Sequence, residues 1–135
     1  KDVVTMMIKI EKIEQYYGGE RGSSFFAKNE GRPLISILKR NKGTVSGHHY
    51  HTEKTKGKNP EVFVLISGKM ELYVEDIKTK ESQTHIIEEN TLFEIPPYIY
   101  HEVKAITDFV ALEFNVSMED QTNVIEGKEL QWKKY

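Results

Sequence analysis

Three histidines stand close together in the sequence, at positions 48, 49 and 51. Side chains alternate along a β-strand, so His49 and His51 are predicted to share one face while His48 points outward to the surface. The Cα atoms of such a pair lie about 6 to 7 Å apart, which suits two neighbouring ligands of one metal ion. Imidazole also titrates near neutral pH and can both take and give a proton. A chance pair of surface histidines is the alternative interpretation.

The histidine pair belongs to a longer pattern of fixed spacing. The pattern consists of Gly43-x5-His49-x-His51, then Glu61-x6-Gly68, and later Pro96-x4-His101. These segments resemble the two sequence signatures of the cupin superfamily. The resemblance implies one divalent transition metal ion (Zn, Fe, Mn or Ni) bound by His49, His51, Glu61 and His101.

Strand alternation supports the same four residues separately. Glu61 shares a face with Phe63 and Leu65, and His101 shares a face with Val103, as expected at the inner wall of a barrel. A carboxylate on such a face needs a partner or a metal. Three imidazoles and one carboxylate leave coordination positions open for water or substrate, as in catalytic metal sites. A metal-free barrel whose polar groups bond one another is the alternative.

The chain departs from the cupin pattern at four places. Asn90 and Tyr98 replace glycines, Ala105 replaces an asparagine, and nine residues separate His51 from Glu61, more than in the pattern. Asparagine tolerates the left-handed conformation, so we expect Asn90 to form the turn that a glycine would form. The long gap predicts a loop insertion over 52–60. None of the implied ligands is lost.

Four further residues are candidates for the site. Glu113 lies in an apolar segment and would serve as a catalytic base if it were desolvated. Tyr98 and Tyr100 are predicted to contact substrate, and Arg40 to bind a phosphate or carboxylate in bidentate fashion. Each has a plainer interpretation, namely a surface carboxylate, packed aromatic rings and a solvated arginine.

The elements that must position these residues follow from a hydrophobic period of two. Strands are predicted at 7–13, 24–28, 34–40, 47–51, 61–67, 70–75, 84–88, 92–95, 101–105 and 109–114. Residues 16–22 are predicted as a loop and 120–124 as a helical turn. Many short strands with frequent turns indicate a sandwich or barrel, and the resemblance implies an all-β double-stranded β-helix, the jelly-roll cupin barrel. We expect one domain over 1–135, with the barrel core at about 34–115 and a polar tail at 116–135.

The predicted strand 61–67 also bears on assembly. Its residues Val62 to Ile66 are all apolar, so both faces of the strand favour burial. A one-layer barrel covers only the inner face. The outer face then needs a second sheet or a partner subunit, and we predict a homodimer.

Composition excludes several classes of protein. The 135 residues contain no cysteine, which removes disulfides and thiolate chemistry. Lys and Arg number 19 against 21 Asp and Glu, so nothing favours nucleic acid or an anionic membrane as a partner. No apolar run approaches the roughly 20 residues of a membrane helix, and the N-terminus lacks the pattern of a signal peptide. We therefore expect a cytoplasmic protein that binds a small molecule.

Shorter matches narrow the expected function. The segments 21–23, 34–40, His49-x-His51 and 100–102 resemble sugar-nucleotide ketoisomerases that act on dTDP-linked 4-keto sugars, in which the histidine pair is thought to move protons. The segment 95–98 and the region of Glu61 resemble the cupin-type phosphoglucose isomerases, which use a metal. The resemblances imply a sugar or sugar-nucleotide isomerase or epimerase with His49, His51 and Glu61 as catalytic groups. If the histidines hold a metal, the base must be another group, such as Glu61, Glu113 or metal hydroxide. An Fe-dependent dioxygenase and a non-catalytic small-molecule-binding module are the alternatives.

Overall fold

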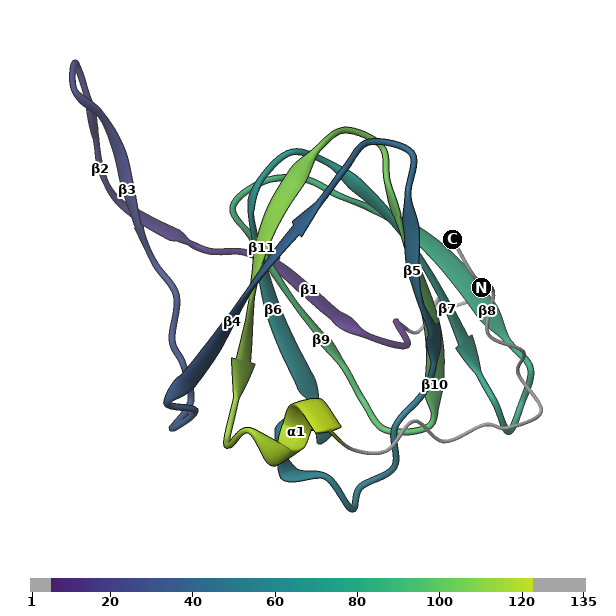
Figure 1. Ribbon diagram of the computed structural model, residues 1–135. Coiled ribbons are helices and arrows are strands. Elements are labelled where there is room, and N and C mark those ends of the chain that lie inside the picture. The colour runs from purple at the N-terminus through teal and green to yellow at the C-terminus, as the bar shows by residue number, and fades with distance from the viewer. Residues whose placement is uncertain (1–5, 123–135) are drawn as a thin grey trace, which may run out of the picture.

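The computed structural model describes residues 6–122, which form two facing antiparallel sheets and a separate hairpin (Figure 1). The five-stranded sheet has the order β1 (Lys9–Lys12), β9 (Thr91–Ile95), β6 (Glu61–Ser67), β11 (Phe109–Asn115) and β4 (Leu34–Arg40). The four-stranded sheet has the order β5 (Val45–His49), β10 (Ile99–Ala105), β7 (Met70–Asp76) and β8 (Ser82–Ile87). The hairpin pairs β2 (Glu14–Gly19) with β3 (Gly22–Phe26) and projects from the barrel, while the short helices η1 (Lys56–Lys58) and α1 (Glu119–Thr122) contact each other.

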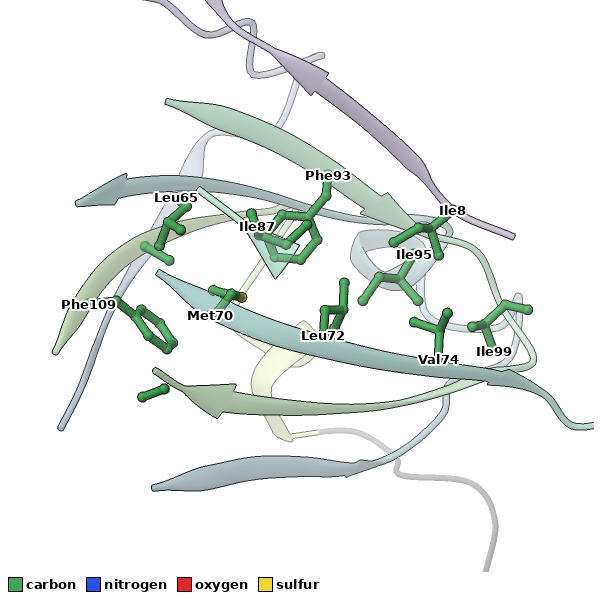
Figure 2. Close-up of a cluster of buried hydrophobic side chains, with 12 residues drawn as sticks. Ile8, Leu65, Met70, Leu72, Val74, Ile87, Phe93, Ile95, Ile99 and Phe109 are labelled. Carbon is green, nitrogen blue, oxygen red and sulfur yellow. The ribbon is translucent and has the colours of Figure 1, made fainter. Parts of the chain in front are cut away.

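This architecture is the all-β jelly-roll barrel expected from the sequence. The core lies between the two sheets, because alternate side chains of each strand point inward. Met70, Leu72 and Val74 of β7 face Leu65 of β6 and Phe93 of β9, and all five are at most 2% exposed (Figure 2). Burial of each such side chain stabilises the fold by about 1.5–3 kcal/mol. The core thereby fixes the spacing of the sheets, and polar residues take inward positions at the end of β5 and the start of β6.

A second apolar cluster covers much of the outer face of the five-stranded sheet. Val62 and Val64 of β6 are 2% and 0% exposed, and they pack with Leu92 and Phe114 and with Ile13, which follows β1. The chain therefore covers these two valines itself, and they do not require a partner subunit. The expectation that the outer face of β6 needs a partner subunit is therefore wrong for these two valines, and the homodimer stays a prediction.

Most predicted strands are found within two residues of their expected bounds, but residues 16–22 were predicted wrongly as a loop. They belong to the β2–β3 hairpin, in which Gly19 pairs with Gly22 across a two-residue turn. Glycine-rich sequence signals a turn without telling a long loop from a tight hairpin. The predicted helical turn begins at Glu119 in α1. The tail beyond residue 122 lies outside the described residues, and no helix of the described part is long and apolar enough to cross a membrane.

Candidate acid–base and metal site

A β-bulge in β5 turns His49 toward the interior of the barrel. In the ladder with β10, Ser46 pairs with Val103 and Gly47 with Glu102, but His49 pairs with His101. His48 is the extra residue, and it adopts a left-handed conformation with φ of 63°. In a regular strand without the bulge, strict alternation from Ser46 would point His49 away from the interior. The bulge thus places His49 beside the inward-facing His101.

His48 itself lies on the opposite side of the sheet, as predicted, but the prediction that it is a surface residue is wrong. Its side chain is 2% exposed. Its Nδ1 lies 3.3 Å from the hydroxyl of Tyr100 and 3.3 Å from Oε2 of Glu102. The bulge presses the ring against these outward side chains of β10, so it is buried although it does not face the core.

The structure brings His49, His51, Glu61 and His101 together. One potential ligand atom from each lies within 4.8 Å of the others. The ring centroid of His49 is 4.7 Å from that of His51 and 4.7 Å from that of His101. Glu61 completes the cluster, with Oε1 at 3.1 Å from Nε2 of His101 and Oε2 at 3.7 Å from Nε2 of His51.

Backbone carbonyls orient two of the three imidazoles. Nδ1 of His49 lies 2.9 Å from the carbonyl of Gly47, and Nδ1 of His101 lies 3.1 Å from the carbonyl of Ile99. A carbonyl only accepts hydrogen bonds, so each Nδ1 carries the proton and donates it. In the neutral ring the unprotonated nitrogen is then Nε2, which is available as a base or as a metal ligand.

Burial and charge drive the pKa values in the cluster apart. Burial, together with the nearby His101, lowers the pKa of His49 from 6.5 to about 3. Burial alone would lower the pKa of His101, but the Glu61 carboxylate outweighs it and raises that pKa. Burial would raise the pKa of Glu61, yet the charge and hydrogen bonding of His101 hold it well below its usual range. At neutral pH His49 is uncharged, and the contact between His101 and Glu61 favours the charged form of both of these groups.

This donor set fits a divalent transition metal ion. Imidazole nitrogens and a carboxylate oxygen are ligands that such ions prefer. Oε1 of Glu61 is buried and lies 3.1 Å from Nε2 of His101, so a carboxylate oxygen stands next to the imidazoles that would share the metal ion. The four donors converge from the end of β5, the residue two positions beyond it, the start of β6 and the middle of β10.

Comparisons with known proteins bear on the fold of this chain. No family model and no curated protein matches it. A dTDP-4-dehydrorhamnose 3,5-epimerase from Sulfolobus tokodaii superposes with a TM-score of 0.65 and 18% identity over 84% of this chain and 72% of that one. A sugar 3,4-ketoisomerase from Thermoanaerobacterium thermosaccharolyticum, solved with TDP, gives a TM-score of 0.69 and 16% identity over 88% and 87%. A variant of that ketoisomerase was solved with TDP-4-keto-6-deoxyglucose.

A TDP-quinovose 3,4-ketoisomerase from Campylobacter jejuni is similar in the same way, with a TM-score of 0.65 and 17% identity over 82% of this chain and 85% of that one. All three are jelly rolls of the cupin superfamily. This chain has the cupin fold.

The departures from the cupin pattern leave the backbone of the site in place. Asn90 has a φ of 64°, so the predicted left-handed conformation is confirmed, and Tyr98 has a φ of 68° in place of the second glycine. The amide of Tyr98 donates to the carbonyl of His51 at 2.7 Å. Tyr98 therefore lies beside the cluster, where its hydroxyl bonds Glu53 and its ring lies under the ammonium of Lys78.

Lys58 is a member of the site that the sequence interpretation missed. It comes from η1 in the inserted loop, and its side chain is 6% exposed. Its Nζ donates to Oε2 of Glu113 in a short contact and lies 3.6 Å from Oε2 of Glu61. Burial raises the pKa of Glu113, although Lys58 acts in the opposite direction. Glu113 is thus a buried neighbour of the four-residue cluster, and Lys58 is its partner. Its role as a catalytic base stays a prediction.

The inserted loop is fixed at Gly57, next to Lys58. The amide of Gly57 donates to Oδ1 of Asp120 at 3.1 Å, and the carbonyl of Gly57 accepts from Nη1 of Arg32 at 2.9 Å. Asp120 is 4% exposed and also accepts from the amides of Val116 and Ser117. No sequence pattern indicated this contact, because it joins three segments far apart in the chain.

Two predicted substrate residues do not meet the cluster. Tyr100 lies on the opposite face of β10 from His101, with its hydroxyl bonded to Glu102. Arg40 ends β4 opposite Phe109, four residues along β11 from Glu113, and its guanidinium donates to the carbonyl of Lys39. A role for either residue in binding substrate stays a prediction.

Proposed function

We propose that this protein is an isomerase or epimerase of a sugar nucleotide, with its acid–base chemistry at the cluster of His49, His51, Glu61 and His101. The observation that carries the proposal is the convergence of three imidazoles and one carboxylate inside the barrel. The structural neighbours add support, because their names are those of enzymes that epimerise or isomerise dTDP-linked sugars. The substrate class follows from them, namely a dTDP-linked 4-keto sugar.

The protein's own groups suit proton transfer at a carbon next to a carbonyl. His49 is the half-exposed member of the cluster and is uncharged at neutral pH, so its Nε2 can accept the proton. Glu61 favours the imidazolium form of His101, which would stabilise charge that develops on the carbonyl oxygen. The opposite directions of the two pKa shifts support His49 as the base and His101 as the acid.

We propose further that the same four residues bind one divalent metal ion, which when bound would polarise the carbonyl group. Both roles use the same Nε2 atoms, so the metal and the proton compete. Titration of chelator-treated protein with Zn²⁺ should give one site per chain, and His101→Ala should abolish it. A wild type that binds no Zn²⁺ would remove the metal from the proposal and leave the acid–base role.

The decisive test of the activity is solvent exchange. The protein is incubated with dTDP-4-keto-6-deoxyglucose in D₂O without oxygen, and deuterium uptake next to the carbonyl is followed by NMR. We expect uptake with the wild type, a loss of about 10²-fold or more with His49→Gln, and normal uptake with the control His85→Gln. The dTDP-linked sugar with no keto group serves as a blank substrate.

Other outcomes identify the alternatives. Oxygen consumption that depends on added Fe(II) would favour the dioxygenase, since three histidines and a carboxylate also suit that ion. A rise in melting temperature with the nucleotide sugar, without exchange or oxygen consumption, would favour a binding module. Either result would overturn the isomerase proposal.

A further inference from the structure

Lys58 places a fixed positive charge at the carboxylate end of the cluster. Its side chain is 6% exposed, and its Nζ lies between Oε2 of Glu113 and Oε2 of Glu61, with Oδ1 of Asn115 at 3.5 Å. Lysine side chains are rarely buried unless they are paired. The three surrounding oxygens account for the burial of this one.

The position of this ammonium group is held by the fold. Gly57, the preceding residue, is anchored on one side by Asp120 and on the other by Arg32. A Cβ at position 57 would lie 1.7 Å from Oδ2 of Asp120, so the loop packs directly against that carboxylate. The fold therefore holds the ammonium group of Lys58 at the cluster, away from solvent.

Besides His101, Glu61 has two possible cationic partners, a metal ion and Lys58, and Lys58 is built into the chain. A metal ion bound by the three imidazoles would need a Glu61 oxygen as its fourth ligand, and Lys58 Nζ lies 3.6 Å from one of the two oxygens. Two cations a few Å apart in a poorly solvated site repel each other more strongly than they would in water. Entry of a divalent ion must work against this repulsion.

We propose that Lys58 is an internal cation that competes with a divalent metal ion for Glu61. The inference rests on the metal site of the proposed function and deepens it. Lys58 weakens metal binding and, together with His101, keeps Glu61 paired when no metal is bound, so that the cluster retains a balanced set of charges for proton transfer. Removal of the ammonium group should convert the cluster into a tighter metal site.

The test measures the dissociation constant of Zn²⁺ by calorimetry on chelator-treated full-length protein. Lys58→Met keeps the length of the side chain and removes its charge, and we expect at least about tenfold tighter binding than in the wild type. Lys56→Met, at an exposed position of the same helix, is the matched control and should leave the dissociation constant unchanged. Lys58→Arg keeps the charge and should give no gain in affinity.

A second pair of variants covers the case in which Lys58→Met does not fold, because that substitution leaves Glu113 buried without its lysine. Glu113→Gln removes the charge of the carboxylate, and the double variant Lys58→Met/Glu113→Gln removes the charges of both side chains. We expect the double variant to bind Zn²⁺ more tightly than Glu113→Gln does. Equal dissociation constants in either comparison, or no Zn²⁺ binding by any folded variant, would overturn the inference.

The outcome is independent of the sugar-nucleotide activity. Tighter Zn²⁺ binding in Lys58→Met together with no isomerase activity in the wild type would support the role of Lys58 and overturn the proposed reaction. Unchanged Zn²⁺ binding together with deuterium exchange by the wild type would do the reverse.

Discussion

At the scale of single residues, the uncharged state of His49 is the property of the site that pH can probe. Folding lowers its pKa from 6.5 to about 3. Between pH 6.5 and 4.5 the unfolded chain takes up a proton at this position and the folded chain does not. The free energy of unfolding must therefore fall as pH falls through this window, by at most about 1.4 kcal/mol per pH unit for this group.

We expect His49→Gln to flatten that slope in urea unfolding curves recorded in EDTA. His101 adds no slope below pH 6.5, because its raised pKa keeps it protonated in both states, and its contribution is lost only as pH rises above that value. The pKa of Glu61 is lowered, so its contribution is lost only below its ordinary value of 4.5. His85→Gln serves as the comparison variant, because burial lowers the pKa of His85 as well. If the slope of His49→Gln equals that of the wild type, the lowered pKa of His49 is contradicted.

The four residues of the cluster could be predicted from the sequence, whereas Lys58 could not. His49 and His51 are two positions apart, and Glu61 and His101 stand on strands with clear alternation, so spacing and alternation select these four residues. The bulge that turns His49 inward could not be predicted. Lys58 stands in a polar loop with other lysines, where nothing local separates a buried from a solvated ammonium group. Its burial follows from its contact with Glu113 and from the hydrogen bond between Asp120 and the neighbouring Gly57. Only the folded chain brings these groups together.

At the scale of elements, the bulge in β5 orients the pair of His49 and His51. Gly47 has a φ of 98°, and a Cβ there would lie 2.8 Å from the carbonyl oxygen of His101. Gly43 has a similar φ of 88° but nothing within 4 Å of the same position. The sequence pattern could indicate the strand but not the bulge, since an extra residue leaves no mark in a short run of polar residues.

The two glycines form a matched pair for a stability measurement. Gly43→Ala should cost about 1 kcal/mol, from the left-handed backbone alone. Gly47→Ala should cost about 3 kcal/mol, because the added methyl group also displaces β10 at His101. Free energies of unfolding from urea curves give both values, and equal losses would mean that the close approach to His101 is not rigid.

The inserted loop offers a second test at this scale. Asp120 accepts hydrogen bonds from the amides of Gly57, Val116 and Ser117. Asp120→Ala leaves these buried donors without an acceptor and should lower the free energy of unfolding by about 2–3 kcal/mol. Met118→Ala, at a 67% exposed position two residues away, should change it by no more than about 0.5 kcal/mol. A small effect at Asp120 would mean that the loop holding Lys58 is stabilised by other contacts.

At the scale of the whole molecule, the jelly roll separates an apolar core from the polar cluster and leaves several apolar side chains exposed, two groups of which lie on β4 and on the hairpin. On the five-stranded sheet, Ile35 and Ile37 of the edge strand β4 are 49% and 64% exposed. On the hairpin, which projects from the barrel (Figure 1), the rings of Tyr16 and Phe26 stack with centroids 4.2 Å apart, and the two residues are 58% and 55% exposed. The hairpin leads directly into β4, so both groups belong to one region of the chain.

This region is where we expect the predicted homodimer to form, since exposed apolar groups of this kind favour association. The sequence argument pointed to the outer face of β6, which the chain largely covers itself, whereas β4 and the hairpin retain uncovered apolar area. Light scattering at micromolar concentration should give the mass of a dimer for the wild type and of a monomer for Ile37→Lys. Ile86→Lys on β8, at a 53% exposed position of the other sheet, is the control and should remain dimeric. A monomeric wild type would contradict the prediction of a dimer. A dimer that is disrupted by Ile86→Lys but not by Ile37→Lys would contradict the predicted location of its interface.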